Sequence, residues 1–237
     1  MTDNTNFYAN GLGDQLIDES CYPQSIKDFL RDEEAYLTII SSSFDILVEV
    51  GCMHGRYLDW TVKNGKKYIG IDPVKRYITV GKNSVSSLEL DPEDYKFILG
   101  SAEDLPLLLS DVLSNQSKGR VLLLFPFNCI GNMSDLSAVL KSVHDTGFSY
   151  LISTYNTDSY ANYCRMEYYQ QCGFKMIKMD LKSEGILFTS VDDLHTIAYH
   201  INYFQSQCDH VNLGCVPIIL SNLLVMYGNF NVSSFIL

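Results

Sequence analysis

Short apolar runs alternate with amphipathic stretches through the middle of the chain, from about residue 44 to residue 155. The runs that predict strands are 44–50, 67–72, 94–99, 120–127 and 148–154. The stretches that predict helices lie near 54–63, 74–88, 105–116 and 134–146. Near-continuous apolar strands separated by helices are typical of a parallel sheet covered on both faces. Right-handed crossovers then bring the carboxyl ends of the strands to one edge, where ligands bind.

The chain on either side of this region follows different patterns. Residues 1–21 are polar and predict a loop, and Pro23 begins a helix. That helix has one apolar stripe, formed by Ile26, Phe29, Leu30, Leu37 and Ile40.

After Tyr155 the alternation stops, and the Tyr-rich stretch 156–174 predicts a helix. Strands are expected at 175–180, 185–190 and 194–199, with Asp192-Asp193 turning a hairpin between the last two. A single helix over 191–206 is the rival interpretation, because several apolar residues there fit a helical period. We prefer the hairpin. A helix near 200–208 and strands at 210–216 and 218–227 complete the prediction.

The strongest chemical signal is the sequence Val48-Glu49-Val50-Gly51-Cys52-Met53-His54-Gly55, in which an apolar strand enters a glycine turn. Gly51 has no Cβ, so ligand atoms can approach the main chain there. Gly55 lies where the next helix is expected to begin, and free N–H groups at a helix start attract anions. The spacing is not G-x-G-x-x-G, which disfavours a dinucleotide-binding oxidoreductase. The next strand ends in Asp72, 21 residues after Gly51, where an acid accepts hydrogen bonds from ribose hydroxyls.

Glu49, the turn from Gly51 to Gly55 and Asp72, in this order, resemble the motifs of the class I S-adenosylmethionine-dependent methyltransferases. Residues 97–106 are similar to the third-strand segment of that family, G-D-A-E-x-L-P, and residues 121–128 to its fourth strand. The resemblance covers roughly residues 44–155. It implies an α/β fold with a seven-stranded, mostly parallel sheet, helices on both faces and an antiparallel last strand. It also implies one domain over 1–237, with an N-terminal lid at 1–43 and a substrate cap at 155–199.

The same resemblance implies S-adenosylmethionine as cofactor and S-adenosylhomocysteine as product. Asp72 is then expected to hold the ribose, and Glu49 to support the methionine part directly or indirectly. Ser101 stands where the family usually has Asp, which leaves Glu103 or a water for the adenine amine. His54 is expected to neighbour the cofactor. The expected cofactor-binding residues are Glu49, Gly51, Cys52, Met53, Gly55, Asp72, Pro73, Ser101, Ala102, Glu103, Phe125 and Phe127.

The acceptor is the less specific part of the prediction. The sequence Phe125-Pro126-Phe127-Asn128 differs from the N-P-P-[YF] motif of many amino-methyltransferases, and Asn128 either orients the substrate or makes a turn. Seven tyrosines between 155 and 203 suit a mostly apolar pocket that orients a small organic molecule. The expected substrate-binding residues are Asn128, Tyr160, Tyr163 and Tyr199. The candidates for removing a proton from the acceptor are His195, His200 and Tyr155.

Composition and charge limit the classes of partner and the compartment that we expect for this chain. A net charge of −11 disfavours nucleic acid, whose phosphates are usually neutralised by clustered Lys and Arg. No apolar run reaches the roughly 18–20 residues that span a bilayer, and the N-terminus lacks a signal-peptide pattern, so we expect a cytoplasmic protein. Seven scattered cysteines without a C-x-x-C pair predict reduced thiols. No Cys/His cluster predicts a metal site. We expect a monomer or homodimer with a small-molecule substrate.

These observations predict transfer of the sulfonium methyl group to an oxygen or nitrogen of a small organic acceptor. Two alternatives stay open. One is methylation of a protein or RNA, and the other is a protein that binds S-adenosylmethionine without methylating.

Overall fold

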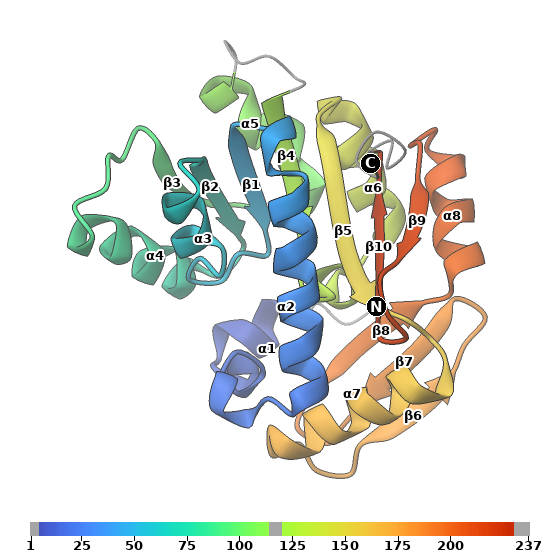
Figure 1. Cartoon of the computed structure of the whole chain (residues 1–237). Helices are drawn as coiled ribbons and strands as arrows, with labels where there is room; N and C mark the ends of the chain where they lie inside the picture. Colours follow the sequence, from blue (N-terminus) through green and yellow to red (C-terminus); the bar gives the residue numbers. More distant parts are fainter. Residues whose placement is uncertain (1–4, 114–119, 230–237) are drawn as a thin grey trace.

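The computed structural model describes residues 5–113 and 120–229, and its centre is a seven-stranded sheet in the order β3-β2-β1-β4-β5-β10-β9 (Figure 1). The strands are β1 (Ile46–Val50), β2 (Lys67–Asp72), β3 (Tyr95–Leu99), β4 (Val121–Phe125), β5 (Ser149–Tyr155), β9 (Val216–Ile219) and β10 (Leu224–Gly228). Strands β1 to β5 pair in parallel, and β10 runs antiparallel to both β5 and β9. The predicted fold class, with its reversed last strand, is confirmed.

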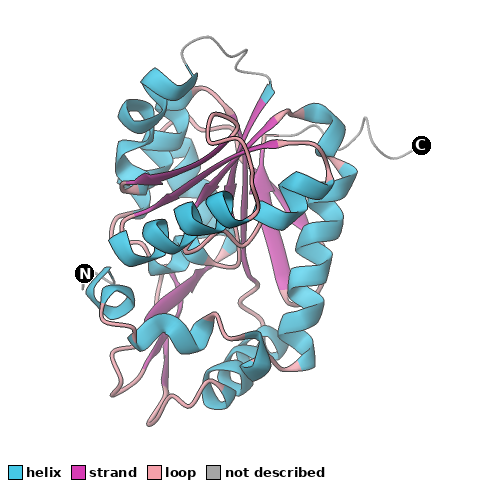
Figure 2. Cartoon of the chain, turned by 90° about the vertical axis from the view of Figure 1, so that its left-hand side faces the viewer, coloured by secondary structure: helices cyan, strands magenta, loops and turns pink. Residues whose placement is uncertain are grey.

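Helices cover both faces of this sheet, because successive side chains of each strand enter opposite cores. In β1, Leu47 joins the core under α2, α3 and α4, whereas Val48 joins the core under α5, α6 and α8. Figure 2 shows helices along both faces of the sheet. The helices are α1 (Thr5–Ala9), α2 (Gln24–Ile39), α3 (Leu58–Lys63), α4 (Lys75–Ser87), α5 (Leu105–Leu113), α6 (Leu136–Thr146), α7 (Ser159–Gln171) and α8 (Ile201–His210). Short 3-10 turns are η1 (Leu12–Leu16), η2 (Glu19–Cys21), η3 (Ser41–Ser43), η4 (Ala102–Asp104) and η6 (Cys129–Asn132).

A second, three-stranded antiparallel sheet lies with α1 and α7 beyond the carboxyl edge of the main sheet (Figure 1). Its strands are β6 (Lys178–Leu181), β7 (Gly185–Thr189) and β8 (His195–Tyr199). The predicted hairpin is confirmed, and the rival helix over 191–206 is wrong, because β8 pairs along its length with β7. Asp193 has a φ of 63°, which an Asp tolerates in a turn. The functional interpretation of 1–43 as lid and 155–199 as cap remains a prediction.

Several boundaries differ from the sequence prediction. The loop expected over 1–21 contains α1, η1 and η2 within the described residues, because Phe7 is buried against Phe174, with ring centroids 6.1 Å apart. The helix expected from residue 54 begins only at Leu58, since the glycine turn continues to Tyr57. The helix expected over 105–116 is present over Leu105–Leu113, and 114–116 lie outside the described residues. The strand expected at 210–216 is wrong, because α8 continues to His210 and β9 covers 216–219.

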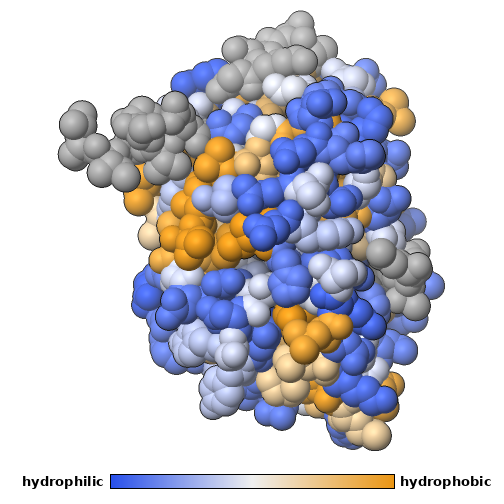
Figure 3. Space-filling model, turned by 90° about the vertical axis from the view of Figure 1, so that its right-hand side faces the viewer, coloured by the Kyte–Doolittle hydropathy of each residue, from blue (hydrophilic) through white to orange (hydrophobic). Residues whose placement is uncertain are grey.

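One edge of the main sheet is formed by β9, which within the described residues pairs with β10 only. Val216 and Ile219 there are 52% and 62% exposed, and apolar side chains gather on this side of the molecule (Figure 3). None of the helices in the described part of the chain has the length and apolar character needed to cross a membrane.

Candidate functional site

A cavity of about 470 Å³ lies at the carboxyl ends of β1 to β4. This volume is within the range of small-molecule sites, and the location is the one expected for a parallel sheet. The chain brings ten of the sequence-predicted site residues into its lining. They are Gly51, Met53, Asp72, Pro73, Ser101, Ala102, Glu103, Phe127, Asn128 and Tyr155.

The glycine turn is held tightly against β2. The N–H groups of Gly51 and Cys52 both donate to the carbonyl of Ile71, at 2.8 and 3.1 Å. Gly51 has a φ of 73°, and a Cβ there would lie 3.1 Å from the Cβ of Cys129. Met53 has a φ of 52°, so a non-glycine residue also occupies left-handed backbone in this turn. The turn therefore presents main chain, with no side chain at residue 51, to the cavity.

Asp72 ends β2 as a buried carboxylate that lines the cavity. Its Oδ2 accepts the N–H of Met53 and its Oδ1 accepts the N–H of Val74, both at 2.9 Å. Burial raises the pKa of this carboxyl, while these two N–H groups oppose the change. Because each carboxylate oxygen accepts about two hydrogen bonds, Asp72 keeps two acceptor positions, one on each oxygen. Two adjacent hydroxyl groups match this arrangement.

The segment after β3 supplies the next part of the lining. Ser101, Ala102 and Glu103 all line the cavity, and the hydroxyl of Ser101 donates to the carboxylate of Glu103. Glu103 thus presents a carboxylate acceptor in the segment where the sequence resemblance predicts the adenine.

Glu49 lies behind the glycine turn and is absent from the cavity lining. It is fully buried, and its Oε2 accepts the hydroxyl of Tyr68 at 2.6 Å and the N–H of Tyr57 at 3.1 Å. Its Oε1 has no hydrogen-bond partner among the described residues. Burial raises the pKa of Glu49 to about 7. Glu49 thus supports the turn that leads into α3.

Glu49→Gln tests this environment through the pH dependence of stability. The pKa of the wild-type carboxyl is about 7 when folded and 4.5 as a reference, so the folded protein retains a proton that the unfolded chain releases. This group therefore lowers the free energy of unfolding as pH rises from about 4.5 to about 7, by up to about 3 kcal/mol. The free energy of unfolding can be measured in urea at pH 5 and pH 8. The difference between variant and wild type should be more favourable to the variant by about 1–3 kcal/mol at pH 8 than at pH 5. A pH-independent difference would contradict the buried, proton-retaining carboxyl.

The turn after β4 contains two consecutive non-glycine residues in left-handed backbone, Phe127 (φ 45°) and Asn128 (φ 56°). The buried carboxylate of Glu33, from α2, accepts the N–H of Phe127 at 3.0 Å and the hydroxyl of Ser153 at 2.7 Å. Burial raises the pKa of Glu33 to about 7. Glu33 is a residue that the sequence analysis missed, because a single acid in an amphipathic helix resembles a solvated one.

Asn128 lines the cavity, but its side chain is already engaged by the protein. Its Nδ2 donates to the hydroxyl of Thr196 and the carbonyl of Ile197, both at 3.2 Å, and its Oδ1 accepts the hydroxyl of Thr154. These bonds join the β4 turn to β5 and β8.

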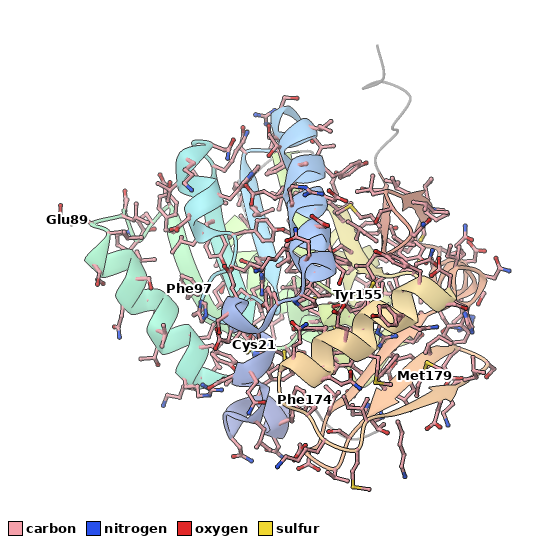
Figure 4. The ribbon with its side chains drawn as sticks, turned by 60° about the horizontal axis from the view of Figure 1, so that its bottom comes forward. Cys21, Glu89, Phe97, Tyr155, Phe174 and Met179 are labelled. Atoms are coloured by element: carbon pink, nitrogen blue, oxygen red, sulfur yellow. The ribbon has the colours of Figure 1, made fainter. Side chains whose placement is uncertain are left out.

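Aromatic side chains surround the end of the cavity that lies beside this turn. The ring of Phe127 has its centroid 6.1 Å from Tyr155 and 5.8 Å from Tyr168, and Tyr168 lies 5.1 Å from Tyr169. Tyr155 lies between α2 and α7 (Figure 4). We call Tyr8, Phe127, Tyr155, Tyr168 and Tyr169, all of which line the cavity, the aromatic end.

Besides Glu49, three more of the predicted cofactor residues lie outside the lining of this cavity. Phe125 is fully buried in the core. Cys52 and Gly55 line a neighbouring cavity of about 590 Å³ behind the turn, together with His54.

The structure does not bring five of the predicted substrate and catalytic residues to the main cavity. Tyr160 and Tyr163 are 53% and 66% exposed on α7. Tyr199 is buried and stacks on Tyr203, with centroids 5.9 Å apart. His195 pairs with Thr189 in the second sheet, and Nδ1 of His200 lies 2.9 Å from the hydroxyl of Thr157. Of the three candidate bases, Tyr155 is therefore the one that lines the cavity.

Part of the N-terminal region 1–43, which the sequence analysis predicts to be a lid, contributes to the lining of the cavity. We call residues 5–17 the lid segment, and Thr5, Tyr8, Leu16 and Ile17 line the cavity. On one side Asp14 forms an ion pair with Arg76 and accepts the hydroxyl of Tyr77 at 2.7 Å. On the other side the carbonyl of Leu16 accepts the hydroxyls of Tyr22 and Tyr168, at 3.0 and 2.6 Å. The lid segment therefore connects α4, next to Asp72, with α7.

Part of this chain matches a known protein family. Residues 48–112 match the family described as Methyltransferase domain. A comparison with curated proteins found no match.

Solved structures share the fold over most of the chain. The 1,6-didemethyltoxoflavin-N1-methyltransferase of Burkholderia thailandensis, solved with 1,6-didemethyltoxoflavin and S-adenosylhomocysteine, is 13% identical, with a TM-score of 0.58 over 95% of this chain and 84% of that one. The PH0226 protein of Pyrococcus horikoshii is 14% identical, with a TM-score of 0.61 over 88% of this chain and 92% of that one. A putative O-methyltransferase of Nostoc punctiforme is 11% identical, with a TM-score of 0.54 over 83% of this chain and 55% of that one. At these identities the likeness establishes the fold.

Proposed function

We propose that this chain is a class I S-adenosylmethionine-dependent methyltransferase and that it methylates an oxygen or nitrogen of a small organic acceptor. The observation that carries the proposal is the lining of the cavity. One end has the glycine turn and Asp72, and the other has aromatic side chains beside the end of β4.

The residues at the first end suit the cofactor. The turn presents main chain at Gly51, and Asp72 keeps one acceptor position on each oxygen for the two ribose hydroxyls. Glu103, beside Ser101, is placed to accept the adenine amine. When bound, S-adenosylmethionine supplies a methyl group already activated by the positive sulfur.

The protein then has mainly to align the reactants and exclude water. Glu33 and Asn128 fix the turn after β4, so Phe127 is held rigidly at the boundary between the two ends. The lid segment covers the cavity through its contacts to α4 and α7.

A small acceptor is supported by the enclosure and by charge. The aromatic end is bounded by the lid segment and by α7, and the chain carries a net charge of −11, which disfavours RNA. The Burkholderia enzyme of the same fold was solved with 1,6-didemethyltoxoflavin and S-adenosylhomocysteine bound.

The test is incubation of the purified protein with methyl-labelled S-adenosylmethionine and a fractionated cell extract. We expect label in the small-molecule fraction, where mass spectrometry identifies the methylated product. Label in the protein or RNA fraction would contradict the small-molecule proposal. Retention of the cofactor without any transfer would instead indicate a non-methylating protein.

Asp14→Ala tests the lid segment. Removing the contacts to Arg76 and Tyr77 should speed dissociation of S-adenosylhomocysteine about three- to tenfold, a modest effect because the ion pair is partly exposed. Stopped-flow fluorescence measures the rate. Asp28→Ala, which breaks the exposed Asp28–Arg31 pair on α2, is the matched control and should leave it unchanged. Equal rates for Asp14→Ala and the wild type would rule out this closure.

A further inference from the structure

The aromatic end of the cavity has an unusual charge distribution. Two carboxylates of the described residues line the cavity, Asp72 and Glu103. Both lie at the end formed by the glycine turn, Asp72 and the segment after β3, which we call the cofactor end. Among the described residues no histidine lines the cavity. The cation Arg56 lines the cavity, with its guanidinium 5.1 Å from the ring centroid of Phe127. A second cation lies behind the aromatic rings.

That cation is Arg165 of α7, which is fully buried. Its guanidinium lies 4.4 Å from the ring centroid of Phe188 and 5.2 Å from that of Tyr155. Nη1 and Nη2 donate to the carbonyls of Ile186 and Thr196, at 3.1 and 3.2 Å. These neutral partners leave the charge uncompensated, since Arg165 forms no ion pair within residues 5–113 and 120–229. An arginine remains charged in proteins, so the positive potential persists where the dielectric constant is low.

Tyr169 connects this charge to the cavity. Nε of Arg165 donates to the Tyr169 hydroxyl oxygen at 3.4 Å, and Tyr169 lines the cavity. Because that oxygen accepts from a cation, the hydroxyl hydrogen is available to donate elsewhere. No described residue accepts a hydrogen bond from it. A donor polarised in this way binds an anionic oxygen or nitrogen better than a neutral one.

We propose that the methyl acceptor is a planar aromatic anion that packs against Tyr155 and is held by the Tyr169 hydroxyl, with Arg165 behind both. This inference rests on the proposed function and specifies its substrate class. The shared chemistry is an acidic ring system, such as a carboxylate, an acidic phenol or an acidic ring N–H, whose proton has left to water before binding. A lone pair of the anion forms the bond to the methyl carbon, the S–C bond breaks, and its electron pair stays on sulfur. No base in the cavity is then required, which agrees with the positions of His195 and His200.

The test uses two probes of the same shape, 2-naphthoate and its neutral amide, 2-naphthamide. Each is titrated by calorimetry into protein saturated with S-adenosylhomocysteine. We expect the wild type to bind the anion at least tenfold more tightly than the amide. Tyr169→Phe should weaken naphthoate about tenfold and naphthamide about threefold or less, because a hydrogen bond to a charged group contributes more.

Tyr163→Phe is the matched control, since Tyr163 lies on the same helix and is 66% exposed. It should leave the affinity for both probes unchanged. Equal affinity of the wild type for naphthoate and naphthamide would overturn this inference, whatever the variants do. A wild type that binds neither S-adenosylhomocysteine nor S-adenosylmethionine would overturn the proposed function, so the two failures are distinguishable.

Discussion

Asp72→Ala is expected to lower the affinity for S-adenosylhomocysteine by at least 100-fold. The substitution removes the carboxylate that offers one free acceptor position on each oxygen, and it also removes the acceptor for the Met53 N–H. Two charge-assisted hydrogen bonds contribute about 1.5–3 kcal/mol each, and each 1.4 kcal/mol is about a factor of ten in affinity. Isothermal titration calorimetry measures the loss directly.

Two controls separate ribose binding from a general effect on the protein. Asp72→Asn keeps one acceptor oxygen and should lose only about tenfold in affinity, because the charge is removed but part of the geometry stays. Asp111→Ala removes an exposed carboxylate on α5 and should bind normally. Wild-type affinity in Asp72→Ala would remove the ribose assignment.

Glu33→Leu is expected to give the largest loss of stability, about 2–4 kcal/mol in the free energy of unfolding. The N–H of Phe127 and the hydroxyl of Ser153 lose the carboxylate that accepts from them, and leaving a buried donor unsatisfied costs about 1–3 kcal/mol. The left-handed backbone of Phe127 and Asn128 then loses one of the hydrogen bonds that hold it in place. Urea unfolding at pH 7 gives the value.

Two comparisons make this prediction specific. Glu33→Gln retains an acceptor oxygen in a side chain of nearly the same shape, so its loss should stay below about 1.5 kcal/mol. Glu34→Leu, at the neighbouring exposed position, should change stability by less than about 0.5 kcal/mol. Equal losses for Glu33→Leu and Glu34→Leu would show that the buried carboxylate does not hold the β4 turn.

The five parallel strands of the main sheet could be predicted because their signals are local. Each strand is a short apolar run, and Gly51, Asp72 and Ser101 come just after or at the end of such a run. Parallel connections bring those ends to one edge, so the cofactor end of the cavity follows from order along the chain. The hairpin of β7 and β8 was recoverable for the same reason, from the turn at Asp193.

The rest of the site depends on contacts between distant segments. Glu33 accepts from Phe127, which lies 94 positions along the chain, and Tyr168 donates to Leu16 across 152. Neither pairing leaves a periodic signal. His195 and His200 were plausible bases by residue type alone, but the register of β8 and the contact with Thr157 place them away from the cavity. Arg165 is fully buried, whereas the sequence pattern predicts that a charged residue in this helix lies on a solvated face.

A crystal structure of the protein with S-adenosylhomocysteine tests the central claim most directly. The ribose hydroxyls should lie within hydrogen-bond distance of the two oxygens of Asp72, with the adenine beside Ala102 and the sulfur facing Phe127. Density for the ligand in the neighbouring cavity around Cys52 and Gly55, or a ribose that makes no contact with Asp72, would contradict the account.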